Sequence, residues 1–136
     1  GFACLGASSM AAILQSCASS NYYAQHLKGS NRIAIKKTEF IRTEKEKTMN
    51  RKYVLIKPEQ FNFPICVFKL SETEYSAVLM ECTHRSCELH NQGDFLMCPC
   101  HGSEFTNKGI VQNPPAEQNL KSFTIQTDHD NIYIQL

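Results

Sequence analysis

Two short segments place cysteine and histidine at spacings that suit a metal site. They read CTHRSC at residues 82–87 and CPCHGS at residues 98–103, and together they give the pattern C-x-H-x13-C-x2-H. Each segment offers one thiolate and one imidazole, so two loops that face each other can present two cysteines and two histidines to one centre. The spacing therefore predicts four metal ligands: Cys82, His84, Cys98 and His101.

A mixed set of two thiolates and two imidazoles suits two different metal centres. Zinc binds such a set in tetrahedral geometry, as in a structural module. In a [2Fe–2S] cluster, two neutral imidazoles in place of two thiolates remove two negative charges, so the cluster accepts an electron more easily, at about −150 to +300 mV. A zinc-stabilised binding module therefore stands as the alternative to a one-electron carrier.

The two segments resemble those of the Rieske iron–sulfur family, in the branch found in cytochrome bc and b6f complexes and in the small subunit of arsenite oxidase. The resemblance covers about residues 32–136. It implies an all-β fold of three stacked antiparallel sheets, with one [2Fe–2S] cluster held between two loops at a tip. It also implies electron transfer within a larger oxidoreductase rather than an enzyme by itself, and a soluble ferredoxin of an oxygenase system is the alternative.

The resemblance assigns a role to each predicted ligand. It implies that Cys82 and Cys98 hold the buried iron, and that His84 and His101 hold the iron nearer solvent. Sulfur would thus serve one iron and ring nitrogen the other.

A second pair of cysteines lies in the same two segments. The resemblance implies a disulfide between Cys87 and Cys100 that ties the two loops together. The ferredoxins of ring-hydroxylating dioxygenases lack this bridge, and a structural zinc site does not need it. Disulfides persist chiefly in oxidising compartments, so we expect the domain on the periplasmic or extracytoplasmic side of a membrane.

Two further residues correspond to positions that tune the cluster in the family. Ser103 matches the serine whose hydroxyl donates a hydrogen bond to a bridging sulfide. Phe105 stands where the members of highest potential have a tyrosine that donates to a ligand sulfur. Because one lost donor destabilises the reduced, more negative state by roughly 1 kcal/mol, we expect a potential about 40 mV lower than with tyrosine.

The residues beside the first histidine depart from the family pattern. Members from respiratory complexes have a leucine and a glycine where this sequence has Arg85 and Ser86. The leucine belongs to the apolar patch that receives quinol. An arginine weakens the quinol interpretation, which stays open, and favours a redox protein partner such as an acidic cytochrome or an oxidoreductase subunit. Residues 113–116, Asn-Pro-Pro-Ala, resemble the proline loop that covers the cluster.

Short β-strands must position these loops. From residue 53 onward, apolar residues alternate or form short runs bounded by Pro, Gly, Asn or Asp, which predicts a small antiparallel sandwich or barrel closed by a hairpin. The charged run at residues 43–52 is expected to be a solvated loop or a short exposed element. The predicted strands span residues 32–36, 53–57, 65–70, 75–81, 94–97, 109–112, 120–128 and 131–136.

The first residues do not resemble the rest. Residues 1–16 are mostly small or apolar and carry no charge, as in the core of a secretory signal or in part of a membrane anchor. Residues 14–17 resemble a bacterial lipoprotein cleavage box, in which Cys17 would be lipidated, and the alternative is a plain thiol beside a hydrophobic helix. We expect a signal or anchor segment at residues 1–17, a linker at 18–31 and the cluster domain at 32–136.

Composition argues against one class of partner and supports a metal site. The chain of 136 residues has a net charge of +1 and 20% charged residues, so nothing in its charge indicates nucleic acid. Its seven cysteines agree with a metal site, a disulfide or both. Cys66 lies in an apolar run and is expected to be a small buried side chain. His26, His90 and His129 lack ligand spacing and are expected at the surface.

Overall fold

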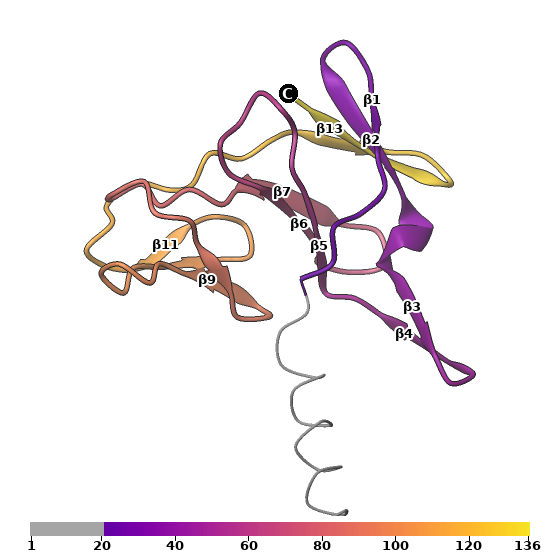
Figure 1. The fold of residues 1–136 in the computed structure, drawn as a ribbon, viewed down its shortest axis with the longest axis horizontal. Coiled ribbons are helices and arrows are strands. Elements are labelled where there is room, and N and C mark those ends of the chain that lie inside the picture. Colours follow the sequence, from indigo (N-terminus) through magenta and orange to yellow (C-terminus); the bar gives the residue numbers. More distant parts are fainter. Residues whose placement is uncertain (1–20) are drawn as a thin grey trace, which may run out of the picture.

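The computed structural model describes residues 21–136, which form short β-strands and one 3-10 helix, η1 (Lys37–Phe40) (Figure 1). In chain order the strands are β1 (Leu27–Lys28), β2 (Arg32–Lys36), β3 (Ile41–Glu44), β4 (Lys47–Asn50), β5 (Tyr53–Ile56), β6 (Ile65–Lys69), β7 (Tyr75–Leu79), β8 (His90–Asn91), β9 (Phe95–Met97), β10 (Glu104–Thr106), β11 (Val111–Asn113), β12 (Ile125–Thr127) and β13 (Asn131–Gln135).

Three apolar runs form the central sheet, in the order β5-β6-β7. Successive side chains on a strand point to opposite faces, and here both faces are buried. The paired residues Val54 and Val67 lie in one core cluster, and the next pair, Leu55 and Cys66, lies in a second. Burial on both faces explains why these strands are continuous apolar runs rather than alternating ones.

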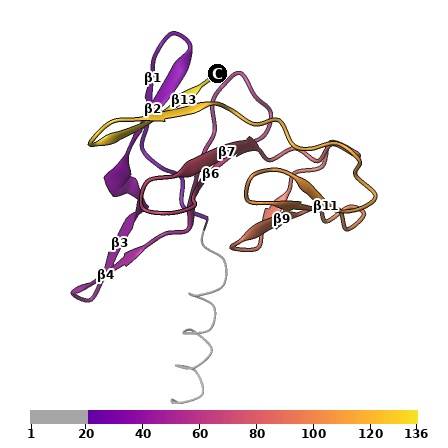
Figure 2. The same cartoon turned by 180° about the vertical axis from the view of Figure 1, so that it is seen from behind.

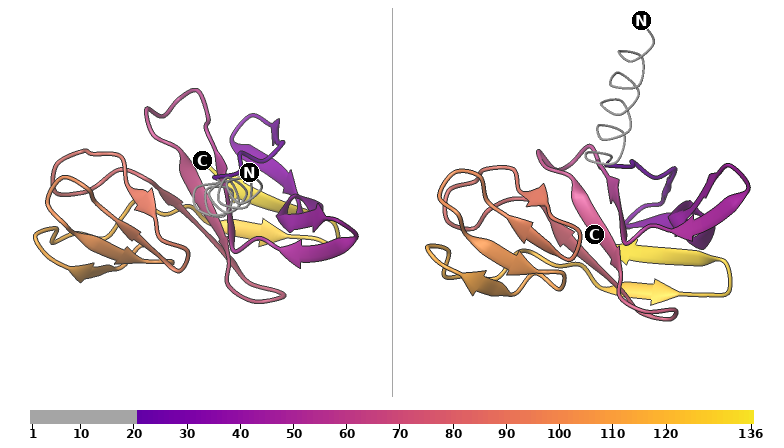
Figure 3. Two further views of the ribbon diagram at one scale, coloured as in Figure 1. Left: turned by 60° about the horizontal axis from the view of Figure 1, so that its bottom comes forward. Right: turned by 90° about the horizontal axis from the view of Figure 1, so that it is seen from below.

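Two four-stranded antiparallel sheets cover the two faces of the central sheet. The sheet β1-β2-β13-β12 adds Ile33 of β2 and Ile132 of β13 to the first cluster. The sheet β11-β10-β9-β8 adds Leu96 and Phe105 to the second cluster. Figure 3 shows the sheet that contains β13 (yellow) and the sheet that carries the cluster loops (orange) on opposite sides of the central sheet.

The prediction of an all-β fold built from antiparallel sheets is confirmed, and so is the closing hairpin of β12 and β13. The three-sheet expectation is incomplete, because β3 and β4 form a fourth, two-stranded sheet within residues 43–52 and just before them. This hairpin projects from the body (Figure 2), and its residues are exposed except for half-buried Arg42.

One predicted strand is much shorter in the structure. Residues 120–128 contribute only the three residues of β12. The segment before β12 crosses from the cluster loops to the far sheet along the edge of β7, where the N–H of Phe123 donates to the carbonyl of Ala77 at 2.9 Å. The short strands β1, β8 and β10 were not predicted.

Residues 21–28, which were expected to belong to a linker, pack on the domain. The N–H of Ala24 donates to the carbonyl of Leu55, and the N–H of Leu55 donates to the carbonyl of Tyr22, both at 2.8 Å. The Tyr22 hydroxyl also donates to Glu39 Oε1 at 2.8 Å. This part of the predicted linker is therefore held against the domain, because the open edge of β5 offers backbone partners to residues 22 and 24 and β1 pairs with β2.

The expected signal or anchor segment at residues 1–17, including Cys17, lies outside the described residues. Within residues 21–136, no helix is long and apolar enough to cross a membrane.

Candidate cluster-binding site

The first cysteine–histidine loop follows β7 and closes on itself through its backbone. The N–H of Cys82 donates to the carbonyl of Cys87 at 2.9 Å, and the N–H of Ser86 donates to the carbonyl of Cys82 at 3.0 Å. Ser86 has a φ of +31°, which a residue with a Cβ adopts under strain. These bonds leave Cys82 buried and Arg85 exposed.

The second loop, between β9 and β10, repeats this hydrogen-bond scheme. The N–H of Cys98 donates to the carbonyl of Ser103 at 2.8 Å, and the N–H of Gly102 donates to the carbonyl of Cys98 at 2.9 Å. Gly102 has a φ of +85° and occupies the place that Ser86 has in the first loop. The two loops are therefore alike in backbone, and each buries its leading cysteine.

The loops bring the four predicted ligands together as two like pairs. Cys82 and Cys98 are each 1% exposed, and Cys82 lies close enough to Cys98 to raise the pKa of its thiol. The rings of His84 and His101 meet edge to face, with centroids 5.1 Å apart. His84 is half-buried and His101 is exposed, so the imidazole pair lies nearer to solvent than the sulfur pair.

A disulfide joins Cys87 to Cys100 and so links the two loops. The sulfur atoms of Cys87, Cys98 and Cys100 all lie within 4.8 Å of one another. Because Cys87 and Cys100 are bonded to each other, this group is not a three-cysteine metal site, and only Cys98 among the three offers a thiolate.

The proline loop is fastened to both cysteine–histidine loops. The N–H of Ala116 donates to Ser103 Oγ at 3.0 Å, and the hydroxyl of Thr83 donates to the carbonyl of Gln118 at 2.7 Å. Thr83 was not singled out from the sequence, because its partner Gln118 lies 35 residues away in the chain. A cleft of about 470 Å³ remains beside the loop, lined by Thr83, His84, Pro115, Glu117 and Gln118.

Charge and hydrogen bonding at these residues fit a positively charged centre. Burial raises the pKa of the Cys98 thiol, and the neighbouring Cys82 raises it further, so without a cation the Cys98 sulfur stays protonated. His84 Nδ1 is buried and has no hydrogen-bond partner within the described part of the chain. Buried polar atoms normally have a hydrogen-bond partner, so this unpaired nitrogen is available to bind a metal ion.

The family model of the Rieske [2Fe-2S] domain matches residues 35–124, a range that contains both loops and the proline loop. The chain belongs to this family. Rieske domains bind one [2Fe–2S] cluster and serve in electron transfer, and the buried thiols and the unpaired His84 nitrogen fit that cofactor. The zinc-stabilised module is therefore set aside.

Named relatives of this Rieske protein come from two kinds of complex. It is 30% identical over 63 residues to the cytochrome b6-f complex iron-sulfur subunit of Chlorobaculum tepidum, an overlap of 45% of this chain and 35% of that one. It is 42% identical over 55 residues to the ubiquinol-cytochrome c reductase iron-sulfur subunit of Blastochloris viridis, an overlap of 38% and 31%. The matched part is thus about a third of the length of these relatives.

Among solved structures, the cyanobacterial plasma membrane Rieske protein PetC3 from Synechocystis PCC 6803 matches with a TM-score of 0.56. The two share 27% sequence identity over 62% of this chain and 87% of that chain. The β-sheet arrangement described above is therefore that of the Rieske fold.

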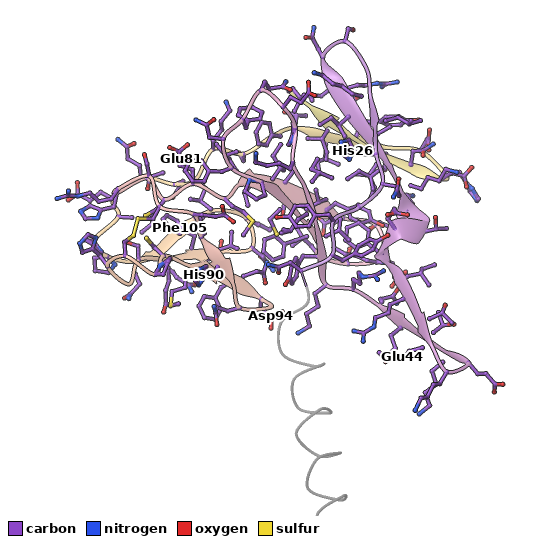
Figure 4. All side chains as sticks on the ribbon, in the orientation of Figure 1. His26, Glu44, Glu81, His90, Asp94 and Phe105 are labelled. Atoms are coloured by element: carbon purple, nitrogen blue, oxygen red, sulfur yellow. A yellow bond between two sulfur atoms is a disulfide. The ribbon has the colours of Figure 1, made fainter. Side chains whose placement is uncertain are left out.

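The structure confirms the predictions for Cys66 and for the three histidines that lack ligand spacing. Cys66 is fully buried between the sheets, where burial raises the pKa of its thiol and Asn91 Nδ2 donates to its sulfur at 3.3 Å. His26, His90 and His129 are exposed. Figure 4 shows His90 and Phe105 in the sheet that carries the cluster loops, and His26 just before β1 of the distant sheet.

Proposed function

We propose that this Rieske domain carries single electrons with Cys82, His84, Cys98 and His101 as its iron ligands. The observation that carries the proposal is that both cysteines are buried, while the two imidazole rings meet edge to face and lie nearer to solvent. When bound, the [2Fe–2S] cluster takes up and releases one electron. The exposed ring of His101 forms the edge that a partner approaches, while the disulfide keeps the loops from opening.

Iron and sulfide analysis of matched variants tests the ligand assignment. Cys82→Ser, His84→Ala, Cys98→Ser and His101→Ala should each lower the iron and acid-labile sulfide content severalfold after reconstitution. His90→Ala removes a histidine from the same sheet and should keep the content of the parent. A His84 or His101 variant that kept the full content and the parent spectrum would contradict the assignment.

One unpaired positive charge beside His84 supports a protein as the electron partner. Arg85 is exposed, and no ion pair or hydrogen bond of its guanidinium is present within residues 21–136. A fixed positive charge next to His84 suits a carboxylate on a redox protein better than a quinol head group. We therefore propose an acidic cytochrome or oxidoreductase subunit as the partner, with quinol as the alternative.

Electron-transfer rates of charge variants separate these partners. Arg85→Leu should slow transfer to an acidic cytochrome about two- to fivefold at low ionic strength, and salt should abolish the difference. Arg42→Leu removes the same charge from the distant hairpin and should leave the rate unchanged. A variant that gained quinol oxidation while its cytochrome rate stayed constant would favour the quinol alternative.

We further propose that the domain works on the extracytoplasmic side of a membrane within a larger oxidoreductase. The disulfide supports an oxidising compartment, and the charge-free residues 1–16 support an anchor or a lipidated Cys17. Fractionation of cells that express the full precursor tests the attachment. Loss of Cys17→Ser from the membrane fraction indicates lipidation, retention indicates a helix, and a soluble parent protein would contradict the attachment.

A further inference from the structure

The free thiol of Cys98 lies beside the disulfide of the same site. Its sulfur is within 4.8 Å of the sulfurs of both Cys87 and Cys100, and all three are held by the two hydrogen-bonded loops. A thiolate at such range attacks a disulfide when it is not bound to metal. In the proposed function this sulfur binds iron, so it is free to react only in protein without a cluster.

We infer that, in protein without a cluster, Cys98 exchanges with the disulfide to give a Cys87–Cys98 bond and a free Cys100 thiol. The Cys98 sulfur, having lost its proton, attacks the Cys87 sulfur. The new bond forms as the Cys87–Cys100 bond breaks, and the electron pair leaves with Cys100, which takes up a proton. One disulfide and one thiol stand on each side, so no oxidant or reductant is needed.

The exposure of the three cysteines sets the direction of the exchange. Cys100 is exposed and Cys87 is half-buried, so water stabilises the departing Cys100 thiolate better than it would Cys87. Attack on Cys100 instead would join residues only two apart and would release the less solvated sulfur. Cys98 is itself buried, so we expect exchange over minutes to hours.

The exchange rests on the proposed ligand role of Cys98 and has a consequence for it. A Cys98 bound to Cys87 cannot bind iron, so cluster-free protein would become unable to take up a cluster until its disulfide is reduced. The cluster must therefore be inserted before Cys98 exchanges with the disulfide. Otherwise a reductant must first break the Cys87–Cys98 bond.

Disulfide mapping of two full-length variants tests the exchange. Cys82→Ser and Cys98→Ser each lack one proposed ligand, but only Cys82→Ser keeps the attacking sulfur. Both carry Cys4→Ser and Cys17→Ser, are alkylated without reduction, and are mapped by tandem mass spectrometry. We expect a predominant Cys87–Cys98 bond with alkylated Cys100 in Cys82→Ser, and an intact Cys87–Cys100 bond in Cys98→Ser.

Two results would overturn the exchange. One is an unchanged Cys87–Cys100 bond in Cys82→Ser. The other is equal involvement of buried Cys66, which would indicate unfolding rather than exchange between neighbouring sulfurs, and circular dichroism of the same sample checks the fold. Because the readout is a covalent bond, either result leaves the ligand assignment to the iron and sulfide analysis.

Discussion

The hydroxyl of Ser103 accepts a hydrogen bond from the backbone N–H of Ala116 at 3.0 Å, and both residues are buried. This bond fastens the proline loop to the second cysteine–histidine loop. An oxygen that accepts from Ala116 has its own hydrogen free to donate elsewhere, which agrees with the sequence-based expectation that Ser103 donates to a cluster sulfide.

Ser103→Ala should change both stability and redox potential. The variant leaves the buried N–H of Ala116 without a partner, which costs about 1–3 kcal/mol of unfolding free energy, measured by urea denaturation. Loss of the donor to the cluster should lower the midpoint by about 40 mV. Ser122→Ala, at an exposed position, is the control. An unaltered midpoint would show that Ser103 fastens the loop without contacting the cluster.

Phe105→Tyr should raise the midpoint potential by about 40 mV, because a phenol that donates to a ligand sulfur stabilises the reduced state. Phe105 is fully buried in the core cluster that also contains Cys82 and Cys98. Redox titration beside the parent measures the shift. Phe123→Tyr, in the other core cluster, should leave the potential unchanged. Equal midpoints for Phe105→Tyr and the parent would refute the argument.

The projecting hairpin should become more rigid with a turn that suits its backbone. Lys45 and Glu46 both have positive φ, +50° and +69°, in the two-residue turn between β3 and β4. Asn-Gly adopts this turn with less strain, so Lys45→Asn with Glu46→Gly should stabilise the hairpin by about 1 kcal/mol and slow its amide hydrogen exchange about fivefold. Replacing both residues by alanine keeps the strain, and slowing in that variant would contradict the explanation.

Asp128 should make the closing hairpin sensitive to acid. The Tyr133 hydroxyl and the N–H groups of Asn131 and Asp130 donate to this carboxylate and hold its pKa below the ordinary value of 3.8. A lowered folded-state pKa means that its stabilisation is fully present above pH 3.8 and is lost as pH falls through the folded value. Asp128→Asn should therefore be less stable than the parent at pH 7. The difference should shrink below pH 3.8, and a constant difference in urea midpoint would contradict this.

The central sheet could be predicted because the residue types of its strands indicate how deeply each strand is buried. Runs such as residues 53–56 and 65–68 are apolar on both faces, and the structure buries both faces. The charged hairpin of β3 and β4 could not be predicted in this way. Its strands bury almost nothing, and its turn residues, Lys45 and Glu46, lack the Asn-Gly signal.

The cluster site was predictable in its ligand candidates but not in what fastens them. Cysteines and histidines can be identified as ligand candidates from their residue type and their spacing. Thr83 and Asn113 hold loops that are distant in sequence, through Gln118 and Gly102, and a hydroxyl or amide acting on a distant carbonyl leaves no local pattern. The packing of residues 21–28 was missed for the same reason, since their backbone partners belong to β5 and β2.

Electron paramagnetic resonance of the dithionite-reduced full chain, combined with a redox titration, tests the central claim most directly. Two thiolates on one iron and two imidazoles on the other predict a [2Fe–2S] signal with a midpoint between about −150 and +300 mV. A midpoint near the value of about −400 mV typical of plant-type clusters would contradict the imidazole ligands. Protein that stays colourless and silent after reconstitution with iron and sulfide would contradict the cluster itself.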